Sequence, residues 1–329
     1  MPLIERSDYR APWWLPGGHV QTIWPTLCRS VPGIAYEREA LQLPDGDVLA
    51  LDWLRAGRRR LVVLSHGLEG HSRRAYVMGM ARAFRQAGWD ALAWNFRDSG
   101  GMANRLPKFT TNHSSEDLAA VVDHAVAGGR YDRVVLVGFS MGGNLTLLYL
   151  GRHADAVPAC VDGAVVFSVP VHAPSAGARL DHPVNALYRR RFLVGLGRRM
   201  ARLNRSHPGL ISLAGYGRIR TLAEFDDRFT APLHGFASGA DYWAACNSRP
   251  CLRRIRVPTL LVNAENDPIL TPECFPTAEA RESRWLFLET PSAGGHCGFT
   301  GGPGPSLWSE HRAVAFAEAA DGAAATAAG

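Results

Sequence analysis

Ser140 is the residue whose surroundings point most directly to chemistry. It lies in the motif Gly138-Phe-Ser-Met-Gly142, which follows the apolar run 134–137 and precedes a helical pattern. A nucleophile in a sharp turn between a strand and a helix has strained backbone angles, so small residues are needed two positions to either side. The N-terminus of the following helix stabilises negative charge that develops near the hydroxyl. The motif therefore predicts that Ser140 is a nucleophile in acyl transfer.

A serine hydroxyl is a weak nucleophile until a base removes its proton, and that base needs an acid to hold its tautomer. In chains that use this turn, the order is serine, acid, histidine, with the last two on loops after late strands. Asp267 follows the apolar run 260–262, and His296 follows the run 285–288 in the glycine-rich segment 294–298. We predict that Asp267 orients His296, the general base, and that the flanking glycines let its imidazole approach the serine.

Other residues could fill these two positions. Glu265 is the rival acid, but the chain has fully left the strand at Asp267, and Pro268 ends the loop there, which favours Asp267. The non-catalytic alternative for Asp267 is a carboxylate that caps a turn before proline. His234 and His311 are the rival bases, although His234 precedes the acid and His311 falls inside the last predicted helix.

Acyl transfer also needs N–H donors for the tetrahedral oxyanion, usually one after the nucleophile and one from the loop after an earlier strand. The backbone N–H of Met141 is the first predicted donor. The turn Ser65-His-Gly-Leu-Glu-Gly70 follows the apolar run 61–64, and Leu68 is its predicted donor. For His66 we predict a structural role, in which its ring holds this loop by hydrogen bonds.

The elements that must position these residues are apolar strands that alternate with helices. The predicted strands cover residues 61–65, 90–95, 133–137, 163–167, 259–263 and 285–288, and the predicted helices cover residues 74–86, 115–126, 141–152, 272–280 and 307–319. This alternation predicts an α/β fold with a mostly parallel central sheet and helices on both faces. Residues 41–51 predict an antiparallel hairpin that turns at Asp45-Gly46, and the segment before it reads as irregular.

The alternation breaks between residues 169 and 256, which predicts an inserted lid between two parts of the core, residues 1–168 and 257–320, with a flexible tail at 321–329. Within the lid, segment 230–235 reads as a loop, whereas an amphipathic helix has the apolar stripe Leu193, Leu196, Met200 and Leu203. This helix carries Arg189, Arg190, Arg191, Arg198, Arg199, Arg202 and Arg205. A solvated face is the simplest interpretation of these arginines, and contact with lipid headgroups or acidic substrates is the alternative.

Composition narrows the class of protein. The chain has 329 residues, of which 47% are hydrophobic and 20% charged, so it can bury a sizeable core. Its net charge of +6 comes from arginines spread over many segments, which argues against a nucleic-acid partner. The six cysteines show no metal-binding or disulfide pattern, so neither a metal site nor a disulfide framework is expected. Acyl transfer through Ser140 requires no cofactor. The N-terminus lacks a signal peptide and no apolar run spans a membrane, so we expect a cytoplasmic protein.

Several longer stretches together resemble one family, the YheT-like α/β-hydrolases, which are described as esterases and lipases. The matching stretches are Gly18-His-Val-Gln-Thr22, Trp24-Pro25, Ser65–Gly70, Asn95-Phe-Arg97, Asn104-Arg-Leu106, Gly138–Asn144, Thr230–Phe236 and Gly294–Phe299. They run through nearly the whole chain. Ser140, Asp267 and His296 match the family's catalytic positions, whereas Gly18 replaces an expected asparagine and Asp98 a usual glycine.

The resemblance implies hydrolysis of a carboxylic ester through an acyl-enzyme, with a small-molecule substrate that has an apolar acyl chain. Acyl transfer to an alcohol and thioester hydrolysis use the same catalytic residues, so they remain alternatives. A binding protein that kept the fold and lost catalysis is the rival from another class, and an intact set of Ser140, Asp267 and His296 argues against it.

Overall fold

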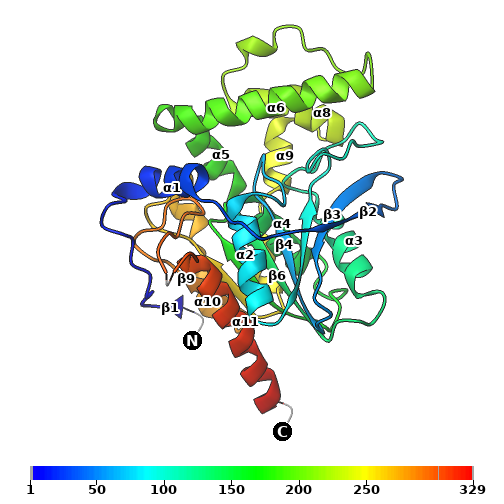
Figure 1. Cartoon of the computed structure of the whole chain (residues 1–329). Coiled ribbons are helices and arrows are strands. Elements are labelled where there is room, and N and C mark those ends of the chain that lie inside the picture. Colours follow the sequence, from blue (N-terminus) through cyan, green and yellow to red (C-terminus); the bar gives the residue numbers. More distant parts are fainter. Residues whose placement is uncertain (1–2, 303, 328–329) are drawn as a thin grey trace.

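The computed structural model describes residues 3–302 and 304–327. These residues form a central sheet with helices on both faces and a helical layer that lies at the top of Figure 1. Within these residues, no helix is both long and apolar enough to cross a membrane.

Nine strands of the described chain form the sheet, in the order β1-β9-β8-β7-β6-β4-β5-β3-β2. They are β1 (Leu3–Ile4), β2 (Glu37–Gln42), β3 (Val48–Leu54), β4 (Arg60–Ser65), β5 (Asp90–Asn95), β6 (Arg133–Phe139), β7 (Val161–Phe167), β8 (Thr259–Val262) and β9 (Leu286–Glu289). Only β3 pairs antiparallel, with β2 and β5, and all other pairs are parallel. The predicted mostly parallel sheet and the hairpin of β2 and β3 are both confirmed.

Six helices of the described residues cover the sheet and its edges. They are α1 (Gly17–Cys28), α2 (Ala75–Gln86), α3 (Ser115–Val126), α4 (Met141–Arg152), α10 (Thr277–Glu282) and α11 (Trp308–Ala327), with a short 3₁₀ turn η5 (Pro272–Cys274) before α10. Val62 of β4 lies in one buried cluster with Phe84 of α2, while Val63 lies in another with Leu118 of α3. Both faces of the strands are therefore buried, which explains why the strands read as continuous apolar runs.

The segment between β7 and β8 consists of helices joined by loops, with no strand among its residues. It comprises α5 (Ala173–Asp181), η1 (Pro183–Asn185), α6 (Ala186–Ser206), η2 (Tyr216–Arg218), α7 (Leu222–Phe225), the π-helical turn η3 (Asp226–Thr230), α8 (Ala231–His234), α9 (Gly239–Ala245) and η4 (Arg249–Arg254). Leu196, Met200 and Leu203 of α6 pack with Phe225 and Phe229 in a core of their own. In Figure 1, α6 stretches across the top of the molecule, far from the end of α11.

Four parts of the fold differ from the sequence prediction. The predicted helix 272–280 is interrupted, because η5 ends at Cys274 and α10 begins only at Thr277. The N-terminal segment read as irregular contains α1, whose pattern is obscured by Pro25 inside the helix, so tertiary contacts rather than propensity must stabilise it. Segment 230–235 is not a loop but contains α8, which tolerates a proline in its first turn and ends at the left-handed Gly235. Helix α11 continues to Ala327 instead of ending at Ala319, because alanine is the best helix former.

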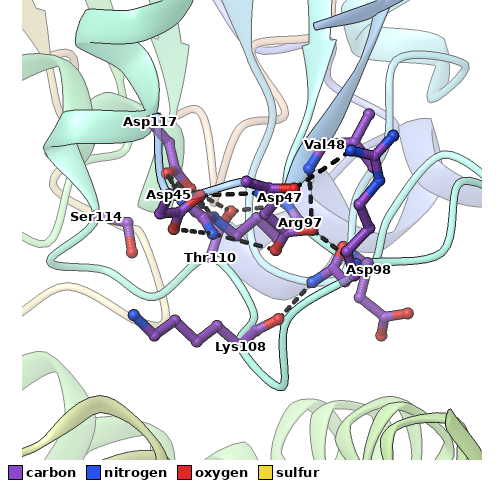
Figure 2. A network of polar contacts seen from close by, with 12 residues as sticks. Asp45, Asp47, Val48, Arg97, Asp98, Lys108, Thr110, Ser114 and Asp117 are labelled. Carbon is purple, nitrogen blue, oxygen red and sulfur yellow. Dashed lines mark hydrogen bonds and ion pairs between the residues drawn. The ribbon is translucent and has the colours of Figure 1, made fainter. Parts of the chain in front are cut away.

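Arg97 joins the turn of the β2–β3 hairpin to α3, as Figure 2 shows. Its guanidinium pairs with Asp45 at 2.7 Å and Asp47 at 3.1 Å in the hairpin turn and with Asp117 of α3 at 2.7 Å. The backbone N–H of Arg97 also donates to the hydroxyl of Thr110 at 2.7 Å. This network fixes the start and the end of the long connection between β5 and α3.

Candidate active site

The turn between β6 and α4 holds Ser140 in a conformation that side chains rarely adopt, with φ of 52° and ψ of −117°. A Cβ atom on Gly138 would lie 2.6 Å from the carbonyl oxygen of Gly142, and one on Gly142 would lie 2.3 Å from that of Ser65. Neither position therefore has room for a side chain, as the motif predicted. The strained serine is a feature that proteins keep where function requires it.

The structure brings Ser140, His296 and Asp267 together in one hydrogen-bonded chain. Nε2 of His296 lies 2.9 Å from Oγ of Ser140, and Nδ1 lies 2.8 Å from Oδ2 of Asp267. The three residues follow β6, β8 and β9, and the carboxyl ends of parallel strands lie at one edge of the sheet. The imidazole is thus oriented to accept the serine proton at Nε2.

Asp267 and its rival Glu265 occupy different environments. The Asp267 side chain is fully buried, and its Oδ1 accepts from the backbone N–H of Ile269 at 2.8 Å and of Leu270 at 3.4 Å. Glu265 is exposed. The buried carboxylate, and not the exposed one, contacts the imidazole.

Helix α1 holds the loops of Asp267 and His296, although no local pattern in the sequence predicted this helix. The Thr22 hydroxyl accepts from the backbone N–H of His296 at 2.8 Å. The Gln21 side-chain oxygen accepts from the N–H of Gly294 at 2.8 Å and from the Asn266 side chain at 2.9 Å. Both residues lie in a stretch that carried the family resemblance, which was the available signal for their role.

The glycines around His296 let its loop pack closely against α1. A Cβ atom on Gly295, whose φ is 59°, would lie 2.6 Å from the carbonyl oxygen of Gly18, and one on Gly298 would lie 2.2 Å from that of Gln21. A Cβ atom on Gly18 would in turn lie 1.9 Å from the carbonyl oxygen of Asn266. Glycine at position 18, where asparagine was expected, thus lets α1 touch the Asp267 loop.

The backbone N–H groups of Met141 and Leu68 are available to bind an oxyanion. Among the residues that the structure describes, no acceptor binds the N–H of Met141 or that of Leu68. The ring of His66 donates from Nδ1 to the carbonyl oxygen of Gly67 at 2.8 Å and accepts at Nε2 from the N–H of Phe96 at 3.2 Å. Burial lowers the pKa of His66 to about 3, so its ring is neutral and can keep both hydrogen bonds.

Comparison with known proteins identifies the family of this chain. A family model described as the alpha/beta hydrolase fold matches residues 60–303. The chain belongs to the α/β-hydrolase family. Its relatives include "Putative esterase YheT" of Escherichia coli (strain K12), which is 32% identical over 89% of this chain and 88% of that protein. "Phospholipase ABHD3" of Mus musculus is 27% identical over 92% of this chain and 76% of that protein.

Among solved structures, the esterase Pf2001 of Pyrococcus furiosus shares the fold, with a TM-score of 0.57 at 18% identity. The match covers 88% of this chain and 98% of that chain. The relative at 32% identity and the family model together confirm the resemblance to the YheT-like α/β-hydrolases that the sequence motifs indicated.

A cavity of about 910 Å³ opens beside Ser140 in this α/β hydrolase. Ser140, His296 and Leu68 line it together with residues of α1, α2 and α6. Arginines and apolar side chains share its wall, which makes the cavity amphipathic. A second cavity of about 490 Å³, between the loop of Asp98 and α6, contains none of the three residues of the hydrogen-bonded chain.

The two rival histidines of this α/β hydrolase lie elsewhere. His234, at the end of α8, packs edge-on against Phe109 with ring centroids 4.7 Å apart. Burial lowers the pKa of His234 to about 4. His311 is exposed on α11. The structure therefore brings only the predicted base, among these three histidines, to the serine.

Arg199 of α6 corrects the interpretation of the arginine cluster as a solvated face. Its side chain is only 5% exposed and pairs with Glu69 at 2.8 Å. Glu69 directly follows Leu68 in the loop after β4, so α6 is linked to the predicted oxyanion donor. Asp98, which replaces the usual glycine, has a φ of 59° and pairs with Arg202 at 2.8 Å. Arg199 also lies 3.7 Å from Asp98, so both carboxylates favour its burial, whereas Arg202 remains exposed.

Proposed function

We propose that this α/β hydrolase cleaves carboxylic esters, with Ser140 as nucleophile, His296 as general base and Asp267 as the acid that orients it. The observation that carries the proposal is the chain of hydrogen bonds from Ser140 through His296 to the buried Asp267, starting at a strained turn at the N-terminus of α4. The names of two relatives, an esterase and a phospholipase, support ester hydrolysis as the reaction class.

The proposed reaction has two steps. Nε2 of His296 takes the proton of Ser140 while Oγ attacks the ester carbonyl, and the oxyanion accepts hydrogen bonds from the N–H groups of Met141 and Leu68. His296 then returns the proton to the departing alcohol, which leaves an acyl group on Ser140. Water, deprotonated by His296, attacks the acyl carbon, the bond to Ser140 Oγ breaks, and the acid is released. His296 returns the proton to Oγ, which restores Ser140. No step requires a metal or a cofactor.

The helical segment 169–256 acts in this proposal as a lid over the acyl chain. Leu187, Phe192 and Val194 of α6 line the cavity together with Ser140, which supports an apolar acyl group lying beneath this helix. We further propose a cytoplasmic location. All six cysteines belong to the described residues and are free thiols, as is usual in a reducing compartment.

Two measurements on Ser140→Ala test the proposal. We expect the variant to lose turnover of p-nitrophenyl acyl esters and covalent labelling by a fluorophosphonate, because both need the serine oxygen. The unmodified protein should show both turnover and labelling. Equal circular dichroism spectra of the two proteins would show that the variant is folded. Unchanged labelling of the variant would exclude Ser140 as nucleophile.

Other activities use the same residues, so product analysis must separate them. An acyltransferase would convert added alcohol into a new ester at the expense of free acid, and a thioesterase would cleave acyl thioesters with a higher kcat/KM than oxygen esters. A non-catalytic binding protein would retain a ligand without turnover. The strained conformation of Ser140 and the His296 hydrogen bond favour a catalytic protein over this last alternative.

A further inference from the structure

The cavity beside Ser140 has a wall of arginines that the proposed reaction does not use. These residues are Arg29, Arg73, Arg74, Arg190, Arg191 and Arg198. The cavity-lining residues include one carboxylate, that of Glu69, which is already paired with Arg199. The wall therefore carries a clear excess of positive charge.

Some of these arginines already have partners in the protein. Arg29 is buried and pairs with Glu310 at 2.6 Å, and Arg74 donates to the carbonyl oxygen of Glu69 at 3.1 Å. Arg73, Arg190, Arg191 and Arg198 are exposed and form no ion pair with any carboxylate of the described residues. Arg73 also lies over the ring of Tyr36 at 5.8 Å, a contact that leaves its N–H groups available. Four guanidinium groups in the wall of the cavity that contains Ser140 can thus bind an anion.

Helix α6 carries arginines that are paired within the protein and others that line the cavity. Arg199 and Arg202 pair with Glu69 and Asp98, and Arg189 donates to the carbonyl oxygen of Asp181 at 2.6 Å. Arg191 and Arg198 are seven residues apart, so they lie on one face, about 10 Å apart along the axis. Like charges around a cleft with apolar walls raise the local concentration of anions.

We propose that Arg73, Arg190, Arg191 and Arg198 form a subsite for an anionic group of the ester substrate, a phosphate or a carboxylate on its alcohol part. The planar guanidinium matches both groups through paired hydrogen bonds. The apolar residues of the same cavity take the acyl chain, so the substrate is an amphipathic ester with separate charged and apolar ends. This inference rests on the proposed ester hydrolysis at Ser140 and names its substrate class.

A matched pair of substrates tests the subsite. Monohexanoylglycerol and its phosphate monoester share one acyl chain and differ only in the phosphate, and release of hexanoate measures kcat/KM for each. We expect the unmodified protein to prefer the phosphate ester by at least about ten-fold, since two charge-assisted hydrogen bonds readily supply that factor. The double variant Arg191→Gln/Arg198→Gln should lose most of this preference through a higher KM.

Arg205→Gln/Arg220→Gln is the control, because both arginines are exposed and lie outside the cavity. Their substitution removes the same charge as Arg191→Gln/Arg198→Gln. It should keep the preference of the unmodified protein. Glycerol 3-phosphate should compete with the neutral ester in the control and compete at least about ten-fold more weakly in Arg191→Gln/Arg198→Gln. Equal losses in both double variants would show an effect of net charge, and equal kcat/KM for the two esters would reject the subsite.

Comparing a monomeric substrate with a substrate in vesicles shows whether the arginines bind an anion of the substrate or the anionic headgroups of a membrane. A preference seen with the monomeric phosphate ester assigns the subsite to the substrate itself. A preference that appears only on vesicles with anionic phospholipid assigns the arginines to membrane binding, which the sequence left as an alternative, and contradicts the subsite. Hydrolysis of the neutral ester and Ser140-dependent fluorophosphonate labelling report on the proposed function separately, so it can stand when the subsite fails.

Discussion

At the scale of single residues, the two oxygens of Asp267 have separate tasks. Oδ2 contacts His296, and Oδ1 accepts two backbone N–H groups that fix the rotation of the carboxylate. Because the side chain has no access to solvent, the imidazole takes the place of water as the partner of Oδ2. The proposed role of Asp267 therefore depends on the charge and on the acceptor character of one oxygen atom.

Asp267→Asn is expected to lower kcat by about three to four powers of ten, because an amide can hold the wrong tautomer of the base. Steady-state kinetics on p-nitrophenyl esters measures the loss. Glu265→Gln is the matched control, with the same chemical change two residues away on an exposed side chain, and it should keep normal kcat. Full activity of Asp267→Asn, together with a loss in Glu265→Gln, would transfer the role to Glu265.

Thr22 gives a second prediction at this scale. Its hydroxyl accepts from the N–H of His296 and donates to the carbonyl oxygen of Gly18 at 2.6 Å. Thr22→Val keeps the shape but leaves the histidine N–H unpaired, which typically costs about 1–3 kcal/mol and lets the loop move. We expect kcat to fall about ten-fold or more, while Thr22→Ser, which keeps the hydroxyl, retains it. Equal kcat in the two variants would limit Thr22 to packing.

At the scale of elements, the sequence predicted what local pattern controls. The bounds of β5, α3 and α4 were predicted correctly because apolar periodicity and turn residues define them. The same local signals placed Ser140, Asp267 and His296 after strands, and the structure agrees with that placement. The contact of Thr22 with His296 joins positions 274 apart in the chain, and no local pattern contains it.

The arginines of α6 show the same limit. Their spacing identified an amphipathic helix correctly, but the positions of Glu69 and Asp98 are needed to explain why Arg199 is buried while Arg198 is exposed. A carboxylate in another element can turn an arginine towards the core, because the ion pair offsets part of the cost of burial. Sequence periodicity therefore predicts the helix, and tertiary partners decide which of its charges are free.

Asp226 gives the helical insertion a pH-dependent stability. Burial raises the pKa of this carboxyl to about 7, and the nearby charges of Asp181 and Asp227 add to the rise. Hydrogen bonds from Thr230, at 2.5 Å, and from Trp243 lower the pKa and so offset part of the rise. Tyr242 and Cys246 face the same site as neutral groups. The folded state then binds more protons than the unfolded state between about pH 4 and pH 7, so stability falls as pH rises through this range.

Asp226→Asn is expected to remove this dependence, since its amide oxygen can still accept from Thr230 and carries no charge. The free energy of unfolding of Asp226→Asn minus that of the unmodified protein should increase by roughly 2–3 kcal/mol between pH 5 and pH 8. Above pH 8 this difference should change little. Urea unfolding at several pH values measures it. Asp155→Asn, at an exposed carboxylate, should leave the pH dependence unchanged. A constant gain at all pH values would mean that Asp226 does not titrate in this range.

At the scale of the whole molecule, Arg97 connects parts of the chain that the sheet alone does not hold together. It joins the hairpin turn, the end of β5 and α3 through Asp45, Asp47 and Asp117, as Figure 2 shows. Asp47 and Asp117 are buried, and Asp47 also accepts from the backbone N–H groups of Val48 at 2.9 Å and Arg105 at 2.8 Å. Removal of the guanidinium would leave buried carboxylates without a cation.

Arg97→Ala is therefore expected to lower the free energy of unfolding by about 3–5 kcal/mol, as when one partner of a buried ion pair is lost. Arg97→Lys should recover only part of it, because an ammonium cannot bind Asp117 and Asp45 with the geometry of the guanidinium. Burial raises the pKa of Asp117, so protonation at low pH should partly relieve the unpaired charge, and the loss should be smaller at pH 5 than at pH 7.5.

Urea unfolding of these variants at the two pH values measures the effect, with Arg253→Ala as the control. Arg253 pairs with Glu282 at 2.7 Å, but both side chains are more than half exposed, so the midpoint should not move measurably. If Arg97→Ala were no less stable than Arg253→Ala, the hairpin, β5 and α3 would be held by apolar packing alone. A large loss that is independent of pH would instead mean that Asp117 stays ionised without its arginine.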